Sequence, residues 1–184
     1  MPYPEYEADV LRTLSLQFNL QDEDSGPSPT PAELRDVLQR AADLGQEVDV
    51  FKRAIFYGST FKREEDGVAH EAVDLHRGDN SPDSRYPSPD MIHSAMGIFT
   101  EAAEFLEAVI ASTFEGEPFD HVNAIEELGD LEWYMAVMRD RLDVSQEDVQ
   151  RRNIAKLRAR YPEKFESSDA LNRDLGRERD ALQG

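Results

Sequence analysis

Two pairs of acidic side chains, each with two residues between them, form the clearest chemical pattern in this sequence. Glu101 and Glu104 form the first pair, and Glu127 and Asp130 form the second. Residues three apart lie on one face of a helix. If the two helices are neighbours, the four carboxylates converge and predict a site for a hard divalent cation.

Basic residues are missing from the sequence around these pairs. Residues 86–138 contain eleven Asp or Glu and no Lys or Arg. Trp133 and Tyr134 lie about one turn beyond the second pair, so we expect Glu127 and Asp130 to be partly buried. Burying an ionised carboxylate costs several kcal/mol unless a cation or hydrogen bonds compensate it. Protonation or a metal ion must supply that compensation, and carboxylate oxygens suit Mg²⁺ or Mn²⁺.

The same acids have a simpler interpretation, as the solvated faces of two amphipathic helices. A single ExxE pair does not separate the two interpretations. Two pairs on adjacent antiparallel helices, the second among aromatic residues and with no basic residue nearby, favour the metal site.

Helices are expected to position the acids, because apolar residues recur every three or four positions through most of the chain. Capping and helix-breaking residues predict where four helices begin and end. The first runs from Thr30 and Pro31 to about Phe56, the second from Pro89 to Gly116, the third from Asp120, and the fourth from Ser145 to Tyr161. No segment of strand length alternates with period two, so the sequence predicts an all-α fold.

Polar segments flank the predicted helical part of the chain. Residues 1–30 are expected to form an amino-terminal extension and linker, and residues 166–184 a polar carboxy-terminal tail. Residues 31–165 form the helical domain that carries the acids. Within it, residues 59–90 are rich in Asp, Gly, Ser and Pro, which predicts a long irregular connection.

Composition limits the partners of the protein. The 184 residues carry a formal charge of -19, which disfavours binding to nucleic acid polymers and to membrane surfaces. No stretch approaches the roughly 18 apolar residues of a spanning helix, and the first residues are unlike a signal peptide. We therefore expect a cytoplasmic protein. Because the chain has no Cys, oxygen or imidazole must bind any metal.

Basic residues near the end of the chain could hold an anionic substrate. Asn153, Lys156 and Arg160 lie along one helix face, where they could receive phosphates. An ordinary basic helix that balances an acidic protein explains them equally well. Lys52 and Arg53, near the end of the first helix, are explained adequately by the helix dipole.

Histidine and tryptophan provide further candidates for substrate contacts. His93 shares a helix face with Glu101, although a single His is more often a capping or hydrogen-bonding residue. Trp133 and Tyr134 could stack on a base, although aromatic residues at helical spacing usually belong to the core. The sequence contains no HExxH zinc motif, no helical ExxH and no P-loop.

Taken together, the two acidic motifs resemble those of a known family. The segment His93-Ser-Ala-Met-Gly-Ile-Phe-Thr-Glu101-Ala-Ala-Glu104, followed after 22 residues by Glu127-Leu-Gly-Asp130, is similar to the MazG-like all-alpha nucleotide pyrophosphohydrolases. The signature of that family is ExxE, a spacer and ExxD. The segments Phe56-Tyr57-Gly58 and Asn153-Ile-Ala-Lys156-Leu-Arg-Ala-Arg160-Tyr161-Pro are also similar, so the resemblance covers about residues 34–165. Ala103 is a departure, because many relatives have Gly there.

The resemblance implies a bundle of four core helices that assembles as a homodimer or homotetramer, with active sites near subunit interfaces. It implies hydrolysis of a (deoxy)nucleoside triphosphate to the monophosphate and pyrophosphate. The residues that it places in catalysis are Glu101, Glu104, Glu127 and Asp130, as ligands of Mg²⁺ or Mn²⁺, with Glu126 as an outer helper or water base.

On the substrate side, the resemblance favours Lys156 and Arg160 as phosphate ligands. Asn153, Tyr161, His93 and Trp133 complete the candidates for substrate contacts. Other assignments stay open, because the same scaffold could act mainly on dUTP, dCTP, a guanine nucleotide or a phosphoribosyl nucleotide. A different class is a catalytically silent helical oligomer whose acids bind divalent ions for stability or for contact with a partner.

Overall fold

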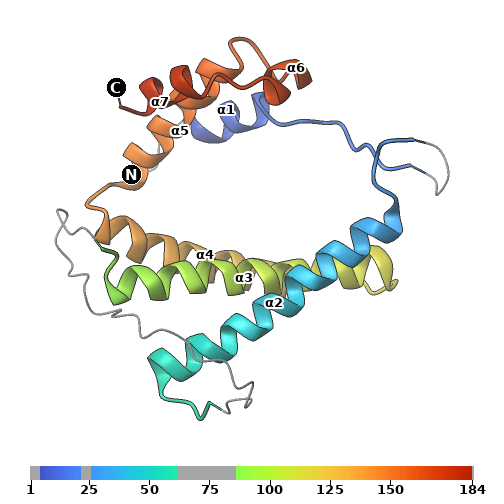
Figure 1. The fold of residues 1–184 in the computed structure, drawn as a ribbon, viewed down its shortest axis with the longest axis vertical. Helices are drawn as coiled ribbons and strands as arrows, with labels where there is room; N and C mark the ends of the chain where they lie inside the picture. The colour runs from blue at the N-terminus through green and yellow to red at the C-terminus, as the bar shows by residue number, and fades with distance from the viewer. Residues whose placement is uncertain (1–4, 22–25, 62–85, 184) are drawn as a thin grey trace, which may run out of the picture. The chain divides into compact units, whose positions relative to one another are not determined.

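A computed structural model describes residues 5–21, 26–61 and 86–183 of the chain (Figure 1). Every regular element within these ranges is an α-helix, which confirms the predicted all-α fold. The helices are α1 (Tyr6–Arg12), α2 (Pro31–Tyr57), α3 (Pro89–Phe114), α4 (His121–Arg141), α5 (Gln146–Arg160), α6 (Ser167–Leu171) and α7 (Leu175–Gln183). None of them combines the length and the apolar character that crossing a lipid bilayer requires.

The helices group into two compact units. In the first unit, residues 1–18 and 143–184, α5 contacts both α1 and α7. In the second unit, residues 19–142, α3 contacts both α2 and α4. The acidic pairs belong to the second unit, so α2, α3 and α4 position the candidate site. The bundle of four core helices that the resemblance implies is not confirmed, because α5 groups with the other unit.

Helix α2 begins and ends where its sequence predicts. The Thr30 hydroxyl accepts a hydrogen bond from the Glu33 amide, and the Glu33 carboxylate accepts one from the Thr30 amide, which completes a capping box. At the other end, Gly58 has φ 71°, a left-handed conformation that strains a residue with a side chain.

Asp120 and Ser145 cap their helices as expected, and Ser88, which is not among the expected caps, does so for α3. The side chains of Ser88, Asp120 and Ser145 accept hydrogen bonds from backbone amides in the first turns of α3, α4 and α5. Helix α5 ends at Arg160, directly before Tyr161 and the proline that follows it.

A close contact between α2 and α3 sets the geometry of the second unit. A Cβ atom added to Gly45 would lie 2.1 Å from the Cβ atom of Ala103, so the two helices approach where only a hydrogen and a methyl group fit. Ala42, nearly one turn before Gly45, is fully buried, and Lys52, two turns after it, is also buried. The side of α2 that meets α3 is therefore made of small and polar residues.

The apolar stripe of α2 is not buried within the described chain, since three of its residues are exposed and the rest are half-buried. The stripe consists of Leu34, Leu38, Ala41, Leu44, Val48, Phe51 and Ile55. Leu44, Phe51 and Ile55 are 50%, 42% and 56% exposed. On α4, Val122 and Ile125 are exposed too. Apolar burial alone therefore does not determine how α2 is rotated against α3.

Buried ion pairs connect the helices of the first unit. Asp9 of α1 accepts a hydrogen bond from Arg158 of α5 at 2.6 Å, and Glu178 of α7 accepts two from Arg160 of α5. Both carboxylates are buried. Residues 166–184, expected to be a polar tail, thus contain two helices, and a buried ion pair attaches α7 to α5.

Most of the connection expected at residues 59–90 lies outside the described residues. Residues 59–61 and 86–88 contain no helix or strand, and α3 already begins at Pro89. The amino-terminal extension, residues 1–30, contains the short helix α1.

Substitution of Gly45 tests the contact between α2 and α3. We expect Gly45→Ala to lower the free energy of unfolding by about 1–3 kcal/mol, because the new methyl group collides with Ala103. Adding Ala103→Gly should restore most of the loss, since it removes the colliding group. Urea unfolding measures both changes.

Gly129→Ala on α4 is the matched control, because an added Cβ atom there meets nothing within 4 Å. It should leave the stability unchanged or raise it by up to about 1 kcal/mol. Equal losses for Gly45→Ala with and without Ala103→Gly would contradict the close contact.

Candidate metal centre

Helices α3 and α4 bring three of the four predicted acids together. One carboxylate oxygen from each of Glu101, Glu127 and Asp130 lies within 4.8 Å of the other two. Glu101 and Glu127 are buried, whereas Asp130 is exposed. The expected partial burial is thus confirmed for Glu127 and wrong for Asp130. Three oxygen ligands leave positions on a hard divalent cation for water or phosphate oxygens.

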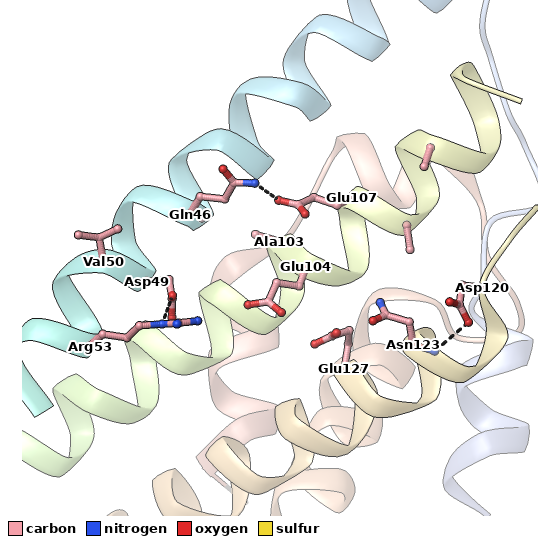
Figure 2. A pocket seen from close by; sticks show the side chains of 13 residues that line it. Gln46, Asp49, Val50, Arg53, Ala103, Glu104, Glu107, Asp120, Asn123 and Glu127 are labelled. Carbon is pink, nitrogen blue, oxygen red and sulfur yellow. Dashed lines mark hydrogen bonds and ion pairs between the residues drawn. The ribbon is translucent and has the colours of Figure 1, made fainter. Parts of the chain in front are cut away.

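Glu104 lies next to these three acids rather than among them. It is half-buried and lines a pocket of about 700 Å³ formed by α2, α3 and α4 (Figure 2). Glu107, Asp49 and Glu127 line the same pocket. Glu127 therefore belongs both to the group of three and to the wall of the pocket, which places Glu104 at the edge of the cluster.

Repulsion between the carboxylates adds to the cost of burying them. Burial, followed by the charges of Glu104 and Glu101, raises the pKa of Glu127 to about 7. Burial, followed by the charges of Glu101 and Asp49, also raises the pKa of Glu104. Both carboxylates have a raised pKa because burial and neighbouring negative charges disfavour their ionised forms.

Glu127 is the acid that lacks a partner. Its side chain is 5% exposed, and it makes no hydrogen bond or ion pair with any residue that the structure describes. Its oxygens keep some contact with solvent at the pocket, but a carboxylate that is so little hydrated and has no donor is disfavoured in its ionised form. One of its oxygens faces those of Glu101 and Asp130, so a bound cation would supply the missing charge. The residues present therefore fit a metal ion.

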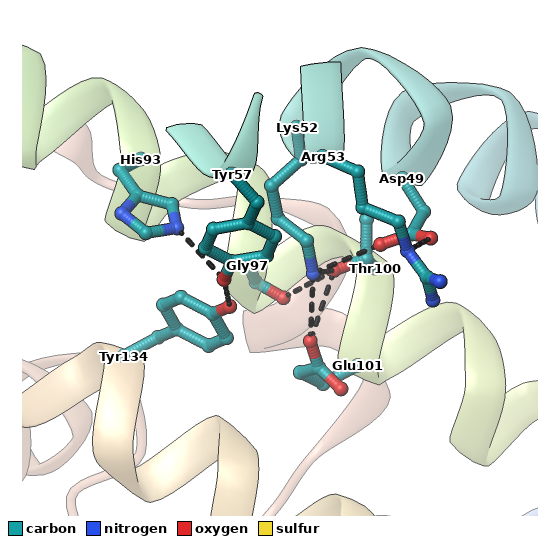
Figure 3. Close-up of polar contacts among 9 residues, drawn as sticks. All are labelled: Asp49, Lys52, Arg53, Tyr57, His93, Gly97, Thr100, Glu101 and Tyr134. Atoms are coloured by element: carbon teal, nitrogen blue, oxygen red, sulfur yellow. Dashed lines mark hydrogen bonds and ion pairs between the residues drawn. The ribbon is translucent and has the colours of Figure 1, made fainter. Parts of the chain in front are cut away.

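Lys52 of α2, which the sequence placed only among second-tier candidates, contributes a cation to this cluster within the described part of the chain. Lys52 is 4% exposed, and its ammonium group lies 2.7 Å from Thr100 Oγ1, 3.0 Å from Glu101 Oε1 and 3.2 Å from Asp49 Oδ1 (Figure 3). Burial lowers the pKa of Lys52, but the hydrogen bonds that its ammonium donates to Glu101 and Asp49 raise the pKa more, so it lies above its ordinary value. The helix dipole does not explain a lysine in this position. Its spacing of three from Asp49 is the signal that could have indicated an ion pair.

Aromatic side chains border the acids on one side. Tyr57, Trp133 and Tyr134 line a second pocket, of about 280 Å³, together with Glu101 and Asp130. Tyr134 is buried, whereas Trp133 is 56% exposed. Of the two aromatic residues that sequence reasoning could assign to the core, only Tyr134 belongs there, and Trp133 is free to meet a ligand.

Gly97 makes room for Tyr134. A Cβ atom added to Gly97 would lie 2.3 Å from the Tyr134 ring, so the ring fills the space that the small residue leaves on α3. The Tyr134 hydroxyl lies 3.2 Å from the hydroxyl of Tyr57, which in turn lies 3.2 Å from His93 Nε2. Figure 3 shows this chain of hydroxyl groups beside Lys52. His93 thus has the hydrogen-bonding role that its sequence position left open.

The remaining predicted residues are not members of this cluster. Glu126 is exposed on α4 and does not join the group of three. Asn153, Lys156, Arg160 and Tyr161 belong to the first unit, whereas the cluster is built from the second unit alone.

Arg160 already has a carboxylate partner. Its Nε and Nη2 atoms donate to Glu178 at 2.9 and 2.6 Å, and Arg173 donates to the same carboxylate. These hydrogen bonds hold the pKa of Glu178 well below its usual range. To bind phosphate, as the resemblance implies, Arg160 would have to exchange Glu178 for the substrate.

Comparison of the chain with protein-family models, with curated proteins and with solved structures gives no match. The resemblance of the acidic motifs to the MazG-like proteins is therefore an expectation from the sequence. A functional assignment depends on the geometry and chemistry of the cluster.

The raised pKa of Glu127 predicts how stability depends on pH. Its folded-state pKa of about 7 exceeds the ordinary value of 4.5, so between these limits the folded chain binds more protons than the unfolded chain. In EDTA, the free energy of unfolding should therefore fall by about 1–3 kcal/mol from pH 5 to pH 8 relative to Glu127→Gln. Urea unfolding across this pH range measures the difference.

Glu132→Gln is the control, because Glu132 is an exposed acid on the same helix. Its pH dependence should match that of the unmodified chain. A Glu127→Gln curve parallel to that of the unmodified chain would show that Glu127 titrates normally.

Proposed function

We propose that this protein is a metal-dependent pyrophosphohydrolase that converts a (deoxy)nucleoside triphosphate into the monophosphate and pyrophosphate. The observation that carries the proposal is the buried Glu127 carboxylate, which has no partner among the described residues and faces Glu101 and Asp130. Such a group favours a hard divalent cation, Mg²⁺ or Mn²⁺. The ExxE and ExxD motifs supply the likeness to the MazG-like architecture and its reaction.

In the proposed reaction, Glu101, Glu127 and Asp130 hold the divalent cation, and Glu104 joins them from the neighbouring pocket. A divalent cation held by these carboxylates would supply positive charge for the phosphates and would lower the pKa of a water molecule for attack on the α-phosphorus. Glu126, exposed beside Glu127, is a candidate for accepting the proton of the attacking water.

The pockets on the two sides of the cluster support a substrate with one polar and one flat part. The pocket with Glu104 carries more acids than bases, with Arg53 paired to Asp49, so a cation would favour the entry of phosphates. The exposed Trp133 ring, in the aromatic pocket, could stack on a base. His93 contacts this aromatic side through Tyr57.

The substrate contacts at Asn153, Lys156, Arg160 and Tyr161 come from the resemblance alone, which assigns Lys156 and Arg160 to the pyrophosphate that leaves. Release of Arg160 from Glu178 is a requirement of this assignment. The proposed homodimer or homotetramer is supported by the exposed apolar residues of α2 and α4, since monomers seldom expose many large apolar side chains together. A cytoplasmic location also belongs to the proposal.

A second candidate is a catalytically silent oligomer that binds divalent ions for stability. The unpartnered Glu127 favours metal binding in both cases, so nucleotides separate them. Thermal unfolding that Mn²⁺ raises, with no further effect of any nucleotide triphosphate, would favour the silent protein. A comparison of hydrolysis rates among substrates would show which base is preferred, or whether a phosphoribosyl nucleotide is the better substrate.

Hydrolysis assays test the proposed reaction. With Mg²⁺ or Mn²⁺, the protein should release monophosphate and pyrophosphate in equal amounts from at least one NTP or dNTP. Glu101→Ala and Asp130→Ala should each reduce the rate at least about 100-fold, because each removes a metal ligand.

Glu117→Gln is the matched control, since Glu117 is an exposed acid between the two helices and should leave the rate unchanged. Release of orthophosphate alone, or full activity in the Glu101→Ala and Asp130→Ala proteins, would refute the proposed function.

A further inference from the structure

The ammonium group of Lys52 has one acceptor for each of its three protons. Thr100 Oγ1, Glu101 Oε1 and Asp49 Oδ1 lie 2.7, 3.0 and 3.2 Å from Nζ. A lysine ammonium has three donors and no acceptor, so these oxygens fix its position completely. The Tyr134 ring lies beside the same group, with its centroid 5.3 Å from Nζ. Lys52 is therefore held as rigidly as a buried side chain of this length can be.

The two oxygens of Glu101 have different surroundings. Oε1 lies 3.0 Å from Lys52 Nζ and 3.1 Å from Thr100 Oγ1. Oε2 makes no hydrogen bond or ion pair with any residue in the described part of the chain. A carboxylate anchored through one oxygen keeps the other in a defined direction. Figure 3 shows the second oxygen turned away from Lys52.

We propose that Lys52 is a positioning residue that, with Thr100, fixes Glu101 through Oε1 and leaves Oε2 to bind the divalent cation. The inference rests on the proposed function, because it assigns a role within the same cluster. It adds a contribution of α2 to a site whose acids come from α3 and α4. Groups that orient a metal ligand in this way typically change metal affinity or activity by about 10- to 100-fold.

Charge repulsion and positioning predict opposite effects of removing Lys52 on metal affinity, which makes the inference testable. A positive charge next to a metal site repels the metal, so removing Lys52 would tighten metal binding if charge alone mattered. Removing an anchor that orients Glu101 would weaken binding. The sign of the change in Mn²⁺ affinity therefore separates positioning from simple charge.

The experiment measures Mn²⁺ binding to the full chain by the electron paramagnetic resonance signal of free Mn²⁺. For Lys52→Met, we expect the dissociation constant to rise about tenfold or more. Arg40→Met is the matched control, because it removes the same charge from an exposed position on α2 and should leave the constant unchanged. A constant that is unchanged or lower in Lys52→Met would overturn the inference.

Thr100 provides a second test that keeps every charge, in case Lys52→Met does not fold. Thr100→Val removes the hydroxyl that contacts both Lys52 and Glu101, and should raise the dissociation constant about fivefold. Thr100→Ser keeps the hydroxyl and should restore the affinity of the unmodified protein. If Thr100→Val lowers only the melting temperature and leaves the constant unchanged, the role is structural and the inference is wrong.

The outcomes also distinguish this inference from the proposed function. Failure of the unmodified protein to bind Mn²⁺ would overturn both. Glu127→Gln could abolish Mn²⁺ binding while neither Lys52→Met nor Thr100→Val weakens it. That result would support the metal site and overturn only the role of Lys52.

Discussion

The stability and packing of the second unit depend on how the charges of two carboxylates buried close together, Glu101 and Glu127, are compensated. Their oxygens lie within 4.8 Å of each other, and among the described residues the cation Lys52 contacts Glu101 but not Glu127. The close approach of α2 to α3 at Gly45 brings that cation into reach, and Tyr134 covers the space above Gly97. The packing of the three helices and the electrostatics of the cluster are therefore coupled. Moving α2 away would expose Glu101 and remove Lys52 from it.

The negative charges of Glu101 and Glu127 are compensated unequally, and the lack of a partner at Glu127 among the described residues is what favours a bound cation. Glu101 has an ammonium and a hydroxyl group on one oxygen, whereas Glu127 has neither and holds its proton up to a pH of about 7. A chain that only needed a stable interface could replace Glu127 with an apolar residue, since buried charges without partners lower stability. Keeping the acid there is reasonable if a divalent cation completes the site. The aromatic and acidic pockets on either side then provide space for a substrate whose two ends differ in polarity.

Local features of the fold could be predicted from the sequence, and long-range features could not. Caps such as Thr30 with Glu33, and Asp120, depend on residues a few positions apart, so their pattern is sufficient. The convergence of Glu101 with Glu127 could be predicted from their spacing and a neighbouring arrangement of helices. The role of Lys52 could not, because it depends on how α2 is rotated against α3, where Gly45 and Ala103 meet closely although they lie far apart in the sequence. The helices after Phe165 were missed because ion pairs, and not periodic apolar residues, attach α7 to α5.

Anomalous diffraction from crystals grown with Mn²⁺ is the most direct test of the central claim. We expect a strong anomalous peak bonded to oxygens of Glu101, Glu127 and Asp130, with Lys52 still in contact with the other oxygen of Glu101. The absence of a peak among these carboxylates at saturating Mn²⁺, or side chains of Glu101 and Glu127 turned out to solvent, would contradict the account.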